Sequence, residues 1–142
     1  MTKEFIINEG TLIKCLNKNA KLIEIPEGII KIYNNAFAYC KEIISIKLPY
    51  SLEIIDDYAF YFCKKLKSIE IPFNVTDIGK YAFAFCKKIK SIIIPHNVIN
   101  IGNNAFFYCE ELEQIVIPKD IINIGTNVFT KSKNKNNVCI VY

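Results

Sequence analysis

Apolar residues return along this chain with a period of 23 residues, and polar residues fill most of the positions between them. A representative unit runs from Leu66 to Cys86. Its apolar positions, which recur in nearly all the other units, are Leu66, Ile69, Ile71, Val75, Ile78, Ala82, Phe83 and Cys86. Several columns held apolar at one strict period indicate repeats that stack, because one unit cannot bury its apolar face alone.

Single residue types mark the same period. The five prolines of the chain lie 23 residues apart, at Pro26, Pro49, Pro72, Pro95 and Pro118. Phe37, Phe60, Phe83, Phe106 and Phe129 keep the same interval. So do Cys40, Cys63, Cys86 and Cys109, with Ser132 in the fifth place. The sequence therefore predicts a solenoid of five stacked repeats.

The pattern within one unit predicts its elements. Apolar residues at Leu66, Ile69 and Ile71 indicate a strand with one buried face, and Pro72 ends it because proline has no N–H. Gly79 begins a column that continues as Gly102 and Gly125, although Tyr33 and Asp56 hold it in the first two repeats. We expect a turn with positive φ at these glycines. Residues 80–86 tolerate helix, and we expect one turn of α or 3-10 helix there.

The unit Leu-x-x-Ile-x-Ile-Pro-x-x-Val-x-x-Ile-Gly-x-x-Ala-Phe-x-x-Cys resembles the BspA-like, or Treponema-type, class of leucine-rich repeats, from Ile23 to Phe129. The resemblance implies a right-handed leucine-rich-repeat solenoid, with a parallel β-sheet on its concave face and short strands and turns on its convex side. We expect one domain over residues 1–142, with a cap segment at 1–22, repeats at 23–130 and a loop with a closing strand at 131–142. Members of the class are mostly surface or secreted proteins of bacteria and protists, associated with adhesion and host-protein binding. They share no single activity, so the fold alone implies little about function.

Composition and charge exclude several classes of protein. No apolar run approaches the roughly 18 residues that a membrane span needs. The net charge of +4 is mild, so we expect no nucleic-acid partner. The first nine residues lack the apolar centre of a secretory signal. That absence and the cysteines favour the cytoplasm, whereas the resemblance favours the cell surface or secretion, and the sequence leaves the localisation open.

The cysteines are expected to be free thiols that act as small core residues. Stacking at about 4.8 Å would bring successive cysteines within the range of a disulfide. However, their side chains would all point inward in parallel, and Ser132 interrupts the series. There is no Cys-x-x-Cys pair or histidine cluster for a metal. We expect no metal or cofactor and, because His96 is the only histidine, no catalytic pairing and no enzyme.

Two columns carry the candidate binding residues. The column two residues before each proline should face outward from the concave sheet, and it holds Glu24, Lys47, Glu70, Ile93 and Val116. The column after each proline should lie on the rim of that sheet, and it holds Glu27, Tyr50, Phe73, His96 and Lys119. Aromatic residues are enriched in binding surfaces. The alternatives are a solvated face with ordinary sequence drift, and rings that stack on one another to cover the turns.

Two further series lie outside these columns. The aromatic series Tyr39, Phe62, Phe85 and Tyr108 either covers the convex side of the core or leaves an apolar flank for a partner. Lysines and glutamates in matching columns predict surface ion pairs Lys87–Glu110, Lys88–Glu111 and Lys90–Glu113. Such pairs contribute about 0–1 kcal/mol each.

These observations favour a non-catalytic scaffold that binds a protein, or a glycan, through the concave sheet and its rim. The residues expected to contact the partner are Lys47, Glu70, Ile93, Val116, Tyr50, Phe73 and His96. The alternative is a structural repeat segment, or spacer, of a larger surface or adhesin-like protein. We expect a monomer or a weak dimer formed end to end or through a sheet edge, because a short C-terminal cap closes the stack imperfectly.

Overall fold

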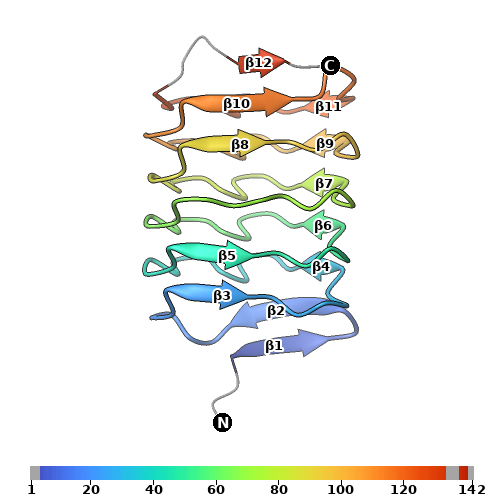
Figure 1. The fold of residues 1–142 in the computed structure, drawn as a ribbon, viewed down its shortest axis with the longest axis vertical. Coiled ribbons are helices and arrows are strands. Elements are labelled where there is room, and N and C mark those ends of the chain that lie inside the picture. Colours follow the sequence, from blue (N-terminus) through green and yellow to red (C-terminus); the bar gives the residue numbers. More distant parts are fainter. Residues whose placement is uncertain (1–3, 134–137, 141–142) are drawn as a thin grey trace.

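A computed structural model describes residues 4–133 and 138–140, and they form a solenoid whose coils stack along its longest axis (Figure 1). One side is a seven-stranded sheet, in the order β1 (Phe5–Asn8), β2 (Thr11–Cys15), β4 (Lys31–Ile32), β6 (Ile54–Ile55), β7 (Asp77–Ile78), β9 (Asn100–Ile101) and β11 (Asn123–Ile124). The other side carries the strands that precede the prolines, namely β3 (Leu22–Glu24), β5 (Ser45–Lys47), β8 (Ser91–Ile93), β10 (Gln114–Ile117) and β12 (Val138–Ile140). We call this second side, with the turns that follow its strands, the proline face.

Strand pairing reproduces the sequence period. Leu22 pairs with Ser45 and Gln114 with Ser91, each in a parallel ladder and each in the same column one repeat away. In the seven-stranded sheet, Ile78 pairs with Ile101 in the same way. The predicted solenoid of parallel strands with a 23-residue repeat is confirmed. The N-terminal pair β1–β2 is the exception, because it is an antiparallel hairpin.

The pairing on the proline face is interrupted at its third coil, residues 66–86. Strands β3 and β5 form one sheet and β8, β10 and β12 form another. Between them, the isolated bridge Ser45–Ser68 takes the place of a ladder. The two sheets are therefore separated by a segment whose apolar residues Ile69 and Ile71 are still buried.

The core is a set of columns that run through the stack. Phe60 lies 5.1 Å from Phe83 between ring centroids, with 6° between the ring planes, and Phe83 repeats the same geometry with Phe106. All three rings are fully buried, as are Cys63 and Cys86. Rings that repeat at the spacing of the coils bury their faces against each other, which explains why this column is always phenylalanine.

The predicted helical turn on the far side of each coil is wrong, because these residues form consecutive hydrogen-bonded turns. In the third coil, the amide of Cys86 donates to the carbonyl of Phe83 at 3.2 Å, three residues back. The amides of Phe83 and Phe85 instead donate to the carbonyls of Ala105 and Phe107 in the next coil. Every second amide of this segment thus donates its hydrogen bond to the next coil. A helix cannot continue through the segment, because it would need these amides for its own hydrogen bonds. The residue before Cys86 has φ of 62°, as the third position of a type II turn requires.

The glycine column has a different cause from the one expected. Positive φ among the glycines occurs at Gly10 and Gly28, and not at Gly79, Gly102 or Gly125. A Cβ built on Gly102 would lie 2.5 Å from the backbone nitrogen of Lys80 in the preceding coil. The last three repeats have glycine in this column because the backbones of adjacent coils approach closely there, and the expected positive φ is not found at these glycines.

Part of the predicted C-terminal segment lies outside the described residues. Of the expected loop and closing strand at 131–142, residues 134–137 and 141–142 lie outside the described residues. The segment 138–140 forms strand β12, which pairs with β10 in parallel. None of the described segments forms a helix that is long and apolar enough to cross a membrane.

Candidate binding surface

The outward column of the proline face lies where the sequence placed it. Ile93 is 62% exposed, although its neighbours Ile92 and Ile94 are buried in the core. Lys47 and Glu70 are exposed in the same column, and Val116 is half-buried. Strand alternation explains this arrangement, because every second side chain of a strand points to the opposite face. A large apolar side chain in a solvent-facing column is a feature that core packing does not require.

The column after each proline forms the rim of the proline face. Tyr50 is 77% exposed and Phe73 is 63% exposed, and His96 is exposed on the following turn. Within the described residues, Tyr50 and Phe73 make no ring–ring contact with each other or with another aromatic side chain. The alternative in which these two rings stack to cover the turns is therefore not what the structure shows. Both side chains are mostly exposed to solvent.

The turn that carries Tyr50 is fixed from both sides. The carboxylate of Glu27 accepts hydrogen bonds from the amides of Tyr50 at 2.9 Å and Ser51 at 3.2 Å. The side-chain amide of Asn74 donates to the carbonyl of Tyr50 at 2.9 Å. Three successive turns are thus joined through side chains. The exposed ring stands on an ordered backbone, which lowers the entropy that a partner must restrict on binding.

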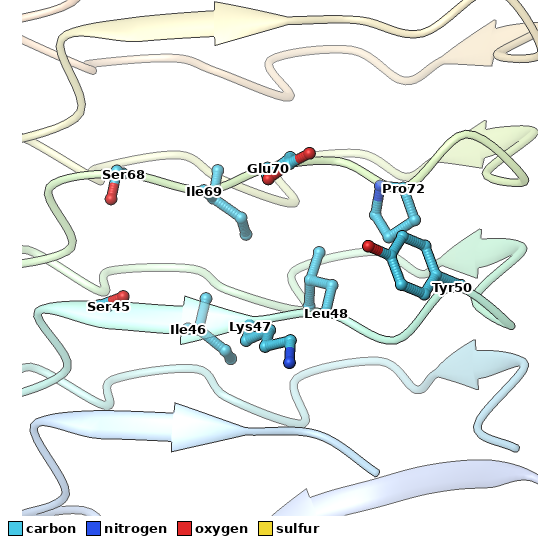
Figure 2. Close-up of a pocket in the computed structure, with 9 residues that line it drawn as sticks. All are labelled: Ser45, Ile46, Lys47, Leu48, Tyr50, Ser68, Ile69, Glu70 and Pro72. Carbon is cyan, nitrogen blue, oxygen red and sulfur yellow. The ribbon is translucent and has the colours of Figure 1, made fainter. Parts of the chain in front are cut away.

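A hollow of about 360 Å³ lies on the proline face where the strand pairing is interrupted (Figure 2). Its lining comes from two coils and consists of Ser45, Ile46, Lys47, Leu48, Tyr50, Ser68, Ile69, Glu70 and Pro72. Three candidate residues, Lys47, Glu70 and Tyr50, are brought together at its edges. The hollow was not predicted from the sequence, because residues 66–72 carry the same apolar pattern as the coils whose strands do pair.

The charged side chains around the hollow differ in whether they form an ion pair. Lys47 forms an ion pair with Glu24 at 3.0 Å, and this hydrogen bond raises the pKa of Lys47. Glu70 makes no ion pair or hydrogen bond with the described residues. A single carboxylate beside an exposed tyrosine ring can receive either a hydrogen-bond donor or a cation from a partner.

The second aromatic series lies on the turns of the opposite side and is less available. Tyr39 is exposed, but Phe62, Phe85 and Tyr108 are half-buried. Phe85 and Tyr108 stack with 5.2 Å between ring centroids and 20° between ring planes. Because the rings cover each other's faces, this series presents mainly ring edges to solvent. It covers the convex side of the core more than it offers a docking face.

The predicted surface ion pairs are partly formed. Lys87 pairs with Glu110 at 3.2 Å, and Lys88 pairs with Glu111 at 2.6 Å. The third glutamate, Glu113, pairs with Lys133 from the following segment. These pairs lie between adjacent coils and hold their register.

The cysteine column is a set of buried thiols, one of which differs from the others in its pKa. Cys86 and Cys109 each donate a hydrogen bond to a carbonyl in the preceding coil, and burial raises the pKa of both thiols. Cys40 differs, because a hydrogen bond with Cys15 and the nearby ammonium of Lys18 lower its pKa to about 7. All five cysteines with described side chains are free thiols. Within residues 4–133, no cluster of histidine, cysteine and carboxylate side chains is suited to a metal ion.

Comparison with family models gives one match. The model of the BspA type leucine rich repeat region matches residues 7–136 in six copies. No curated relative matches the sequence. The match covers nearly the whole chain and extends to both sides of the five proline-marked repeats.

Solved structures of similar fold include bacterial leucine-rich repeat proteins. The leucine rich repeat protein of Treponema pallidum superposes with a TM-score of 0.80 and 28% identity, over 84% of this chain and 58% of its own. A leucine rich cell surface protein of Faecalibacterium prausnitzii gives 0.79 and 30% identity, over 89% of this chain and 35% of its own. A leucine-rich repeat protein of Bacteroides ovatus gives 0.69 and 28%, over 87% and 37%. The chain thus spans about a third to somewhat over half the length of these proteins.

Proposed function

The chain belongs to the BspA-type leucine-rich repeat family, and we propose that it is a non-catalytic scaffold that binds a protein through the proline face and its rim. Repeat scaffolds of this kind commonly mediate protein interactions through an extended sheet face. The residues proposed to contact the partner are Lys47, Glu70, Ile93, Val116, Tyr50, Phe73 and His96.

The observation that carries the proposal is the pair of exposed rings on ordered turns beside the hollow. Burial of a phenylalanine side chain contributes about 1.5–3 kcal/mol relative to leaving it exposed. Tyr50 and Phe73 are not used by the core, so this free energy remains available to a partner. Rigid aromatic side chains that enter a well-packed interface are frequent hot spots of binding.

The candidate residues lie on neighbouring coils of the proline face. Ile93 lies one coil beyond Phe73, and the hollow is lined by residues 45–50 of one coil and 68–72 of the next (Figure 2). A partner that places a side chain in the hollow would contact both rings and the outward column at the same time. This supports a protein surface of several contacts as the partner more than a single small molecule.

Affinity capture from an extract of the native source tests the proposal. The bait is the folded chain, compared with the double variant Phe73→Ala/Ile93→Lys. We expect the variant to bind the captured protein at least about tenfold more weakly, which corresponds to 1.4 kcal/mol of binding free energy. Its melting temperature should stay close to that of the original chain, because both side chains are exposed.

The matched control is Tyr39→Ala/Ile30→Lys, which changes one exposed aromatic residue and one exposed isoleucine on other faces. It should capture as much protein as the unchanged chain. Equal loss in both variants, or undiminished capture by the first, would contradict the proposal. Capture that disappears after enzymatic deglycosylation of the extract would identify a glycan instead. If the folded chain captures nothing specific, the spacer role is supported and the binding role is not.

A further inference from the structure

Cys40 is the first member of the cysteine column, and its surroundings differ from those of the cysteines that follow it. The thiols of Cys63, Cys86 and Cys109 each donate to a phenylalanine carbonyl in the preceding coil, at 3.2–3.3 Å. The first coil, residues 20–40, instead follows the N-terminal hairpin of β1 and β2. The thiol of Cys40 therefore has a different neighbour from the thiols of the later coils.

That neighbour is Cys15, the last residue of strand β2. The amide of Cys15 donates to the carbonyl of Ala36 at 2.9 Å, which places the end of β2 against the turns that lead to Cys40. The side chains of Cys15 and Cys40 lie within hydrogen-bond distance of each other, and the carbonyl of Asn17 lies 3.6 Å from the Cys15 sulfur. Among the described residues, the later cysteines of the column donate to carbonyls and not to each other.

The ammonium of Lys18 contacts the same thiol. Its Nζ lies 3.5 Å from Sγ of Cys40 and donates to the carbonyl of Ala38 at 2.8 Å. The hydrogen bond from Cys15 and this ammonium both stabilise a thiolate at Cys40, and they lower its pKa although burial opposes them. The thiolate is the form of cysteine that reacts with oxidants.

The pair of thiols lies close to the surface of the molecule. Cys15 and Cys40 are buried, but Lys18 and the rest of residues 16–19 are exposed. Exposed side chains change rotamer within nanoseconds, so movement of Lys18 gives a small molecule access to the thiol beneath it. Cys86, by contrast, is enclosed between coils, and burial raises its pKa.

We propose that Cys15 and Cys40 form a peroxide-sensitive dithiol, whose oxidation joins the N-terminal hairpin to the first coil by a disulfide. The thiolate of Cys40 attacks one oxygen of hydrogen peroxide, the O–O bond breaks, and a sulfenic acid forms while the released hydroxide takes a proton from solvent. The sulfur of Cys15 then attacks the sulfenic sulfur, the S–S bond forms, and the proton of Cys15 leaves with the hydroxyl group as water. The two thiols lose two electrons in total, and the peroxide is reduced to two molecules of water. This modification is independent of the proposed binding function.

Treatment of the folded, reduced chain with hydrogen peroxide, followed by peptide mapping, tests this inference. The unchanged chain should give one linked pair of peptides that contains Cys15 and Cys40. Dithiothreitol should restore both thiols, because a disulfide is reversible. Cys63, Cys86 and Cys109 should remain thiols over the same time, because they are enclosed between coils.

Variants separate the roles of the three side chains. In Cys15→Ser the second step is lost, and the sulfenic acid at Cys40 should be captured by dimedone. In Lys18→Gln the linked pair should form about threefold more slowly, because the thiolate at Cys40 is less populated without the ammonium. The matched control is Lys14→Gln, at an exposed lysine of strand β2, and it should react at the original rate.

Each outcome decides the inference. Thiols at Cys15 and Cys40 that survive peroxide overturn it, as does a linked peptide that joins Cys40 to Cys63. Equal rates for Lys18→Gln and Lys14→Gln overturn the activation of Cys40 by the ammonium. If Cys15→Ser does not fold, the linked peptides of the unchanged chain and the rates of the two lysine variants decide alone, since both lysines are exposed.

Discussion

The role of a residue in this molecule depends on its column more than on its type. Phe83 and Phe73 lie ten positions apart in one repeat. Phe83 is fully buried in a ladder of stacked rings, while Phe73 stands exposed on the rim. The sequence predicts both placements, because the first column is phenylalanine in every repeat and the second varies freely. The columns that keep one residue type in every repeat are the ones that pack in the core. The columns that vary are the ones whose side chains can determine binding specificity.

The buried thiols predict a pH dependence of stability at the same scale. Burial raises the pKa of Cys109 from 9.0 to about 12. Above pH 9 the thiol ionises in the unfolded chain but stays protonated in the folded one, so the folded state binds more protons. The free energy of unfolding therefore falls as pH rises through this window, by at most about 1.4 kcal/mol per pH unit for one group.

The variant Cys109→Ser isolates this contribution, because serine already occupies the same column at Ser132 and is buried there. We expect the stability of the unchanged chain, measured by urea unfolding, to fall more steeply above pH 9 than that of the variant. The two should have parallel curves below pH 8. Parallel curves across the whole range would show that the Cys109 thiol ionises equally in both states.

At the scale of elements, the strands follow from the sequence and the turns do not. Alternation of apolar residues before each proline indicates a strand, and pairing at 23 residues confirms it except in the third repeat, where residues 66–72 form only the isolated bridge Ser45–Ser68. Residues 80–86 were expected to form a helical turn, because no local signal forbids one. Their alternate amides are taken by carbonyls of the next coil, such as Phe83 by Ala105. The conformation is thus determined by hydrogen bonds between coils, which compete with those of a helix. The sequence of a single repeat gives no sign of this competition.

The glycine column gives a second prediction at this scale. Replacing Gly102 by alanine would bring a Cβ to 2.5 Å from the backbone nitrogen of Lys80, so the coils must move apart. Overpacking of this kind costs about 1–3 kcal/mol. We expect Gly102→Ala to lower the free energy of unfolding by that amount in chemical denaturation, although alanine has the lower conformational entropy in the unfolded state.

Thr126→Ala is the control, at an exposed side chain in the next coil, and it should change stability by less than about 0.5 kcal/mol. A Gly102→Ala variant as stable as the original chain would mean that the coil spacing adapts without penalty. The close approach would then not explain the glycine.

At the scale of the whole molecule, the residues that stabilise the stack and the residues proposed to bind a partner lie in different columns. The buried residues form one core cluster from Phe5 to Val128, and the outward columns of the proline face change from coil to coil. The sequence predicted the candidate residues but not the hollow beside Lys47 and Glu70. That hollow arises where two parallel sheets fail to join, which depends on small displacements between coils and not on the pattern of any one coil.

The proposed function requires a protein partner to contact the proline face and its rim. Hydrogen–deuterium exchange of the chain, with and without the protein recovered by affinity capture, tests it most directly. We expect slower exchange on binding at residues 45–51 and 68–74, around Tyr50 and Phe73, and unchanged exchange at residues 56–63 on the opposite turns. Slower exchange confined to residues 33–40, 56–63 and 79–86 would contradict it, and would place the partner on the aromatic turns instead.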